Sequence, residues 1–160
     1  LAYESEELKK AQSAYEALLD NKYGRLGKDE KAYVSFALAN CYSYAGRDQE
    51  VQDILGKFDS DFKGFPSRPR ALLMRANLAF RSHADNIRKK AVKDYAELVE
   101  EYPQSREASF ALFYWARAEL HEGRTKEAEF HFTEYLNRFP KGGFAEIAKW
   151  TLGQIKQGNG

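Results

Sequence analysis

Apolar residues recur at helical spacing from Gln104 to Pro140, with polar residues between them. Gly123 interrupts this run and Thr125 follows, an order typical of a helix end and the N-cap of a second helix. Pro140 ends the segment because proline cannot continue a helix. We therefore predict a helical hairpin. Its apolar positions are Ala108, Phe110, Ala111, Phe113, Tyr114, Trp115 and Ala118 in the first helix and Ala128, Phe132, Tyr135 and Leu136 in the second.

The same pattern recurs along the chain roughly every 37–40 residues, as in an array of stacked helix pairs. Gly46 aligns with Gly123, and Asp48 occupies the N-cap position of the following helix. The predicted full pairs are 30–45 with 48–58, 70–83 with 86–101, and 105–122 with 125–138. A lone helix at 3–20 precedes these pairs, and another at 143–156 follows them.

One long break separates the first two pairs, at residues 59–69. Two prolines and one glycine in this segment exclude a helix there. We expect the rings of Phe58, Phe62 and Phe65 to pack back against the core, because otherwise they would form an exposed apolar patch.

These repeats resemble the tetratricopeptide repeat, a unit of about 34 residues built from two helices. Small residues hold the helix-crossing position, alanine and an aromatic residue mark the second helix, and proline ends the unit. The matching residues are Ala39, Ala79, Ala116 and Gly153 at the crossing, Ala91 and Ala128, then Tyr95 and Phe132, and finally Pro103 and Pro140. Departures are Val51 for the alanine, Lys63 for the proline and Asn86 for the turn glycine.

The resemblance covers nearly the whole chain and implies an all-α fold, a right-handed superhelix (α-solenoid) of about eight antiparallel helices. It divides a single domain, 1–160, into an N-terminal half-repeat helix (1–28), repeat 1 (29–69), repeat 2 (70–104), repeat 3 (105–141) and a C-terminal capping helix (142–160). The half-repeat indicates either a fragment of a longer protein or a helix that caps the array.

The links between repeats have the form Tyr/Phe-Pro-x-Ser/Gly-x-x-Ala, beginning at Tyr102 and at Phe139. This form is similar to the repeats of bacterial envelope proteins, namely the TolA-binding protein of the Tol–Pal system and the lipoprotein subunit of the outer-membrane β-barrel assembly machine. The similarity implies a periplasmic or envelope-associated protein, with a cytoplasmic location as the alternative.

Composition narrows the function classes. Residues of apolar type make up 43% of the 160, enough for a packed core, and 25 basic against 24 acidic residues give a net charge of +1. This balance argues against nucleic-acid binding, which needs a basic surface. No apolar run approaches the length of about 18 residues that suggests a membrane-spanning helix, so direct membrane insertion is not expected.

No catalytic pattern is present, and we expect neither an enzyme nor a cofactor. The three histidines do not fall at metal-ligand spacing. Cys41 lies on an apolar helix face beside Leu38, as a small core residue does. Glu100 and Glu101 are adjacent and therefore point apart on a helix, unlike a working acid–base pair.

In tetratricopeptide arrays the first helices of successive repeats line a concave face, which implies a partner-binding groove. Transferring those positions gives Tyr33, Phe36, Asn40 and Tyr44 in repeat 1, Leu73, Asn77, Phe80 and His83 in repeat 2, Phe110, Phe113, Tyr114, Arg117 and His121 in repeat 3, and Trp150 and Gln154 in the final helix. Aromatic residues and arginine are the types that interface cores favour.

Asn40 and Asn77 match the asparagines that grip a ligand backbone in family members binding peptide C-termini. The charged clamp of those members is absent, since Phe36, Phe110 and Tyr114 stand at its positions. The resemblance thus implies a protein–protein interaction scaffold that binds an extended apolar segment of another protein or peptide. Three alternatives stay open. In the first, the asparagines face solvent and the aromatic residues are core. In the second, the array is a spacer or self-assembly module that associates through terminal-helix residues Phe144, Ile147, Ala148 and Leu152. In the third, the chain belongs to an enzyme whose catalytic part lies outside this sequence.

Overall fold

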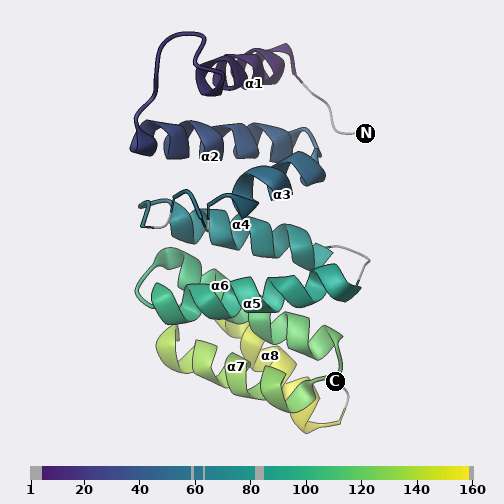
Figure 1. Ribbon diagram of the computed structural model, residues 1–160. Helices are drawn as coiled ribbons and strands as arrows, with labels where there is room; N and C mark the ends of the chain where they lie inside the picture. The colour runs from purple at the N-terminus through teal and green to yellow at the C-terminus, as the bar shows by residue number, and fades with distance from the viewer. Residues whose placement is uncertain (1–4, 59, 63, 82–84, 159–160) are drawn as a thin grey trace. The chain divides into compact units, whose positions relative to one another are not determined.

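The computed structural model describes residues 5–58, 60–62, 64–81 and 85–158. Over these residues the chain forms eight α-helices and no strand (Figure 1), which confirms the all-α prediction. The helices are α1 (Glu6–Leu19), α2 (Lys28–Tyr44), α3 (Asp48–Gly56), α4 (Arg68–Arg81), α5 (Asp85–Glu101), α6 (Arg106–His121), α7 (Thr125–Arg138) and α8 (Ala145–Lys156).

The chain divides into two compact units, Leu1–Ala71 and Leu72–Gly160. The division falls in the first turn of α4, so α1 to α3 belong to the first unit and α5 to α8 to the second. It lies two residues after the predicted start of repeat 2 at residue 70.

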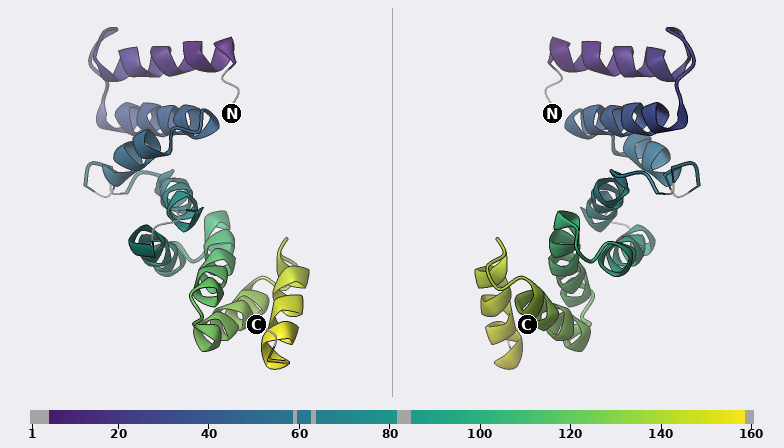
Figure 2. Two further views of the ribbon diagram at one scale, coloured as in Figure 1. Left: turned by 90° about the vertical axis from the view of Figure 1, so that its right-hand side faces the viewer. Right: turned by 90° about the vertical axis from the view of Figure 1, so that its left-hand side faces the viewer.

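In the first unit, α1 and α2 lie side by side and α3 returns against α2 (Figures 1 and 2). Leu38 and Ala39 of α2 and Val51 and Leu55 of α3 are buried, and α2 packs against α3. No residue of α1 is fully buried. A hydrogen bond of 2.6 Å from the Tyr42 hydroxyl to a carboxylate oxygen of Glu16 connects α1 to α2.

The aromatic residues of the long break pack as predicted. Phe58 is almost fully buried, and its ring centroid lies 4.9 Å from that of Phe62, 6.2 Å from that of Phe65 and 6.4 Å from that of Phe36. The end of this break was predicted wrongly, because α4 begins at Arg68 and includes Pro69. Proline is tolerated in the first turn of a helix, where its missing N–H would have no intrahelical partner.

The second unit packs around alanines and aromatic rings at the positions that the repeat pattern marked. Ala79, Ala91, Ala116 and Ala128 are buried and let the helix backbones approach closely. In both views of Figure 2, α7 and α8 lie side by side at the end of this unit. The core they share with α4, α5 and α6 is a single apolar cluster.

The turns after α2 and α6 have the same backbone geometry. Gly46 and Gly123 adopt φ values of 73° and 74°, a left-handed conformation that favours glycine. The next backbone N–H, of Arg47 or Arg124, donates back to the last turn of the preceding helix at 2.9 Å in both cases. Thr125 was wrongly predicted as an N-cap, as was Asp48. Each is the first residue of its helix, because the turn has only three residues and the N-cap position falls on the arginine before it, Arg47 or Arg124.

Candidate functional site

The first unit exposes two of its four predicted groove residues. Tyr33 and Tyr44 are exposed, whereas Phe36 is half-buried against Phe58. The side-chain N–H of Asn40 donates 2.8 Å to the carbonyl oxygen of Phe36, one turn earlier in the same helix. The side-chain amide of Asn40 is therefore hydrogen-bonded to the backbone of its own helix.

Phe113 lies in the centre of the second unit, where only 2% of it is exposed. Its ring stacks on that of Phe144 at 4.3 Å and meets the rings of Phe132 and Tyr135 edge-on, each at 5.7 Å. Phe113 is therefore a core residue and not part of a binding surface. For this residue the alternative that the aromatic residues are core is correct. Phe110, half-buried on the same helix, packs edge-on against Phe144 at 5.4 Å.

Asn77 has a structural partner as well. Its amide oxygen accepts a 2.7 Å hydrogen bond from the hydroxyl of Tyr95, which is fully buried. Burial raises the pKa of Tyr95 and keeps the phenol protonated as a donor. Leu73 of the same helix is half-buried against the apolar cluster. The predicted residue His83 lies outside the described residues.

The remaining predicted residues of the second unit make ring contacts with their neighbours. Tyr114 stacks on Tyr95 at 6.3 Å, and the exposed Arg117 guanidinium lies 5.7 Å from the Tyr114 ring centroid. Further along α6, His121 meets the ring of Phe80 edge-on at 6.3 Å. Ring contacts therefore connect α6 to both α4 and α5.

These contacts end at a groove between α6 and α8, which we call the α6–α8 groove. It encloses about 290 Å³ and is lined by Arg117, Leu120 and His121 of α6 and by Ile147, Trp150 and Thr151 of α8. The buried ring of Phe132 from α7 lies behind them. Large apolar side chains stay exposed here, since Ile147 is 52% and Trp150 67% exposed. Gln154, the other predicted residue of α8, is half-buried and does not line it.

The sequence reasoning placed Arg117, His121 and Trp150 on one surface, and the structure brings these three together. It missed Leu120 and Thr151, and it assigned Ile147 to self-association. The missed residues stand one position or one turn away from predicted ones on the same helices. Their positions next to His121 of α6 and Trp150 of α8 are the signal in the sequence that could have identified them.

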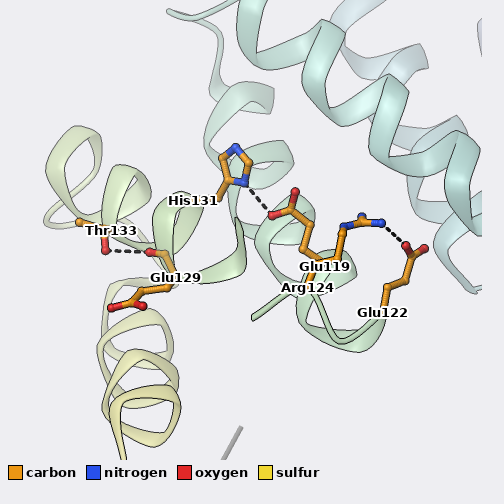
Figure 3. Close-up of polar contacts among 6 residues, drawn as sticks. All are labelled: Glu119, Glu122, Arg124, Glu129, His131 and Thr133. Atoms are coloured by element: carbon orange, nitrogen blue, oxygen red, sulfur yellow. Dashed lines mark hydrogen bonds and ion pairs between the residues drawn. The ribbon is translucent and has the colours of Figure 1, made fainter. Parts of the chain in front are cut away.

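A buried polar pair connects α6 to α7. The Nδ1 atom of His131 lies 2.7 Å from a carboxylate oxygen of Glu119, and the two residues are 9% and 4% exposed (Figure 3). The ring of Trp115 stacks on the imidazole at 3.9 Å. Nothing in the sequence singled out this pair, because its members are twelve positions apart on different helices.

Cys41 is buried, as predicted, and burial raises the pKa of its thiol. Across the described ranges, no cluster of three or more histidine, cysteine or acidic side chains could hold a metal ion. None of the helices in that part of the chain is both long and apolar enough to cross a membrane.

Comparison with protein families agrees with the repeat pattern. The family model for the tetratricopeptide repeat matches residues 70–105 and 110–142. These are the α4–α5 and α6–α7 hairpins, and they correspond to predicted repeats 2 and 3. A search of curated proteins found no significant match. Tetratricopeptide repeats generally act as non-enzymatic scaffolds for binding between proteins, and two segments of this chain match the model of that family.

Proposed function

We propose that the second unit binds an extended segment of a partner protein in the α6–α8 groove. The observation that carries this proposal is the exposure of Ile147 and Trp150 beside Arg117 and His121. Tryptophan and arginine are the side chains most often found at the energetic centre of protein interfaces. A groove between repeat helices is also the place where such scaffolds engage linear segments.

The size and lining of the groove indicate what it accepts. Its volume of about 290 Å³ suits one or two large side chains rather than a folded domain. Leu120, Ile147 and Trp150 favour a ligand with a large apolar side chain, which we call the apolar anchor. Burying such a side chain contributes about 1.5–3 kcal/mol to binding. Arg117 provides hydrogen-bond donors to the backbone of the bound segment. The hydroxyl of Thr151 donates to the carbonyl oxygen of Ile147 at 2.8 Å, so towards a ligand it acts as an acceptor.

Self-association through the terminal helix is the alternative, and most of the residues predicted for it are covered within the chain. Ala148 and Leu152 are buried, and Phe144 stacks on Phe113 in the core. Of the four residues proposed for that role, only Ile147 is exposed, and it lines the groove.

The proposal is tested by comparing Trp150→Ala with Phe130→Ala. The two side chains are similarly exposed, at 67% and 64%, but Phe130 lies on α7 and does not line the groove. Peptides selected from a random displayed library on the whole chain serve as probes. We expect Trp150→Ala to weaken their binding about 30-fold, as loss of about 2 kcal/mol implies, and Phe130→Ala to leave it unchanged. Equal binding by both variants would contradict the proposal. Phe113 is unsuitable for this test, because its removal would disrupt the core.

A further inference from the structure

We infer that the segment bound in the α6–α8 groove carries an acidic residue close to its apolar anchor. This inference rests on the function proposed above and specifies the chemistry of the partner. It is drawn from a second cavity, which we call the basic pocket and which shares His121 with the groove.

The basic pocket has a volume of about 460 Å³. It is lined by Arg88 and Lys89 from the start of α5, by His121 and Glu122 at the end of α6, and by Arg124 before α7. Three permanently cationic side chains therefore face one carboxylate. The Glu122 carboxylate is itself ion-paired with the guanidinium of Arg124 (Figure 3).

Lys89 is the cation in this pocket best placed to meet a ligand. Its side chain is exposed and stands in the first turns of α5. The chain as a whole has a net charge of only +1, so the local excess of positive charge does not follow from a generally basic composition. A concentrated charge of one sign beside an apolar groove selects partners of the opposite sign and repels those of like sign.

His121 connects the two cavities. Because it lines both of them, the two cavities are neighbours, and a segment whose apolar anchor occupies the groove can extend past His121 towards the basic pocket. An extended chain advances about 3.3 Å per residue, so an acidic side chain about two to four residues from the anchor would reach the cations. The chemistry predicted for the partner is thus a large apolar residue with an aspartate or glutamate at short spacing.

The cations of the basic pocket come from α5 and from the turn between α6 and α7, whereas the groove is built from α6 and α8. Charge and apolar character can therefore be altered separately. Lys89→Glu changes the pocket without touching the groove. Glutamate and lysine have similar helix propensities and position 89 is exposed, so this variant is expected to fold.

Lys141→Glu is the matched control. It makes the same change in net charge, but Lys141 follows α7 and lines neither cavity. The 14 residues of α7 place it about 20 Å from Arg124, beyond the Debye length of about 8–10 Å in moderate salt. Circular dichroism and thermal unfolding would show that both variants keep the fold.

The probe is the tightest peptide selected on the whole chain from a random library, together with two analogues. One analogue replaces its acidic residue by the corresponding amide, and the other replaces it by lysine. Affinities of all three peptides are measured by calorimetry for the unaltered chain, Lys89→Glu and Lys141→Glu. Selection of peptides that combine an apolar and an acidic residue is the first expected result.

We expect the amide analogue to bind the unaltered chain about tenfold more weakly than the parent peptide. Lys89→Glu should weaken the parent peptide by a similar factor and bind the lysine analogue more tightly than the unaltered chain does. Lys141→Glu should behave like the unaltered chain. Raising the salt concentration should reduce the affinity of the parent peptide more than that of its amide analogue.

The outcomes separate this inference from the proposed function. Selected peptides without acidic enrichment, or an unchanged affinity for Lys89→Glu, would overturn the inference while leaving binding that depends on Trp150 intact. A library that yields no binding peptide would overturn both.

Discussion

Polar side chains inside the second unit are held in pairs that cross between helices. Glu119 pairs with His131, and the guanidinium of Arg75 donates two hydrogen bonds of 2.7 Å to the carboxylate of Asp94. Bidentate pairs of this kind fix both distance and orientation. Removing one member leaves the other buried without its partner, which costs more than the intact pair contributes.

Replacement of His131 by alanine tests how much the buried pair contributes to the free energy of unfolding. It leaves the Glu119 carboxylate buried and removes the ring that stacks on Trp115. We expect His131→Ala to lower the free energy of unfolding by about 3 kcal/mol. Thr133→Ala, an exposed change on the same helix, should alter it by less than about 0.5 kcal/mol. Urea unfolding followed by circular dichroism measures both, and similar losses would contradict a special role for the pair.

A hydrogen bond between Tyr42 and Glu16 has a pH dependence that can be measured. The hydrogen bond from Tyr42 lowers the pKa of Glu16 below its ordinary value of 4.5. Burial, followed by the bond to Glu16, raises the pKa of Tyr42 from 10.0 to about 12. The contribution of Glu16 to stability is therefore present above its ordinary pKa and is lost as the pH falls through the lowered value. That of Tyr42 is present below pH 10 and is lost as the pH rises towards 12.

Tyr42→Phe removes this bond without opening a cavity. At neutral pH we expect a loss of about 1 kcal/mol in the free energy of unfolding of the first unit. Between pH 10 and 12 the stability of the unaltered chain should fall more steeply than that of the variant. Tyr44→Phe, at an exposed tyrosine of the same helix, is the control. Parallel pH profiles for the unaltered chain and Tyr42→Phe would show that the bond contributes nothing.

At the scale of helices, the connection from α7 to α8 decides where the groove lies. The hydroxyl of Tyr135 accepts a 3.1 Å hydrogen bond from the backbone N–H of Phe144, and this places the Phe144 ring on Phe113. Since α8 begins at the next residue, the same contact positions Trp150 and Ile147 opposite α6.

Gly142 is required in this connection because of space. A Cβ atom there would overlap the Tyr135 hydroxyl oxygen and lie only 3.0 Å from the carbonyl oxygen of Phe139, whereas one on Gly143 would meet no atom within 4 Å. We expect Gly142→Ala to cost about 1–3 kcal/mol of unfolding free energy and to weaken peptide binding, because α8 shifts. Gly143→Ala should change neither. Denaturant unfolding and calorimetry measure the two effects, and equal behaviour of the variants would refute the steric argument.

At the scale of the whole molecule, the two units differ in their repeats, their cores and their cavities. The second unit contains both matched repeats, the single apolar cluster and both cavities used above. The first unit contains α1, none of whose residues is fully buried, and the aromatic cluster around Phe58. Partner binding is therefore expected to depend on substitutions in the second unit.

Sedimentation equilibrium at two protein concentrations tests the self-assembly alternative. We expect a mass of 18.4 kDa at both concentrations, because Ala148 and Leu152 are already covered within the chain. A mass that rises with concentration would favour association through the terminal helices. Such a result combined with Trp150→Ala restoring the monomer mass would assign the groove to a second copy of the chain.

The eight helices and their turns follow from local physics, which a sequence contains. Apolar spacing, Gly46, Gly123 and the alanines at the crossing positions act through neighbouring residues, so they predicted the elements to within a few residues. The fold class is confirmed, and the family model matches the segments predicted as repeats 2 and 3, whereas repeat 1 stays a prediction. An envelope location depends on a repeat style alone and stays a prediction.

Which aromatic residues are core and which are surface was decided only by tertiary structure. Phe113 and Trp150 were both assigned to the groove, yet Phe144 returns from the next repeat to cover Phe113, while Trp150 stays exposed. The partners of Asn77 and Glu119 likewise come from the following helix. Helical periodicity specifies the face on which a side chain stands. Whether that face meets solvent depends on how the next helix is placed, and this is set by long-range contacts such as the bond between Tyr135 and Phe144.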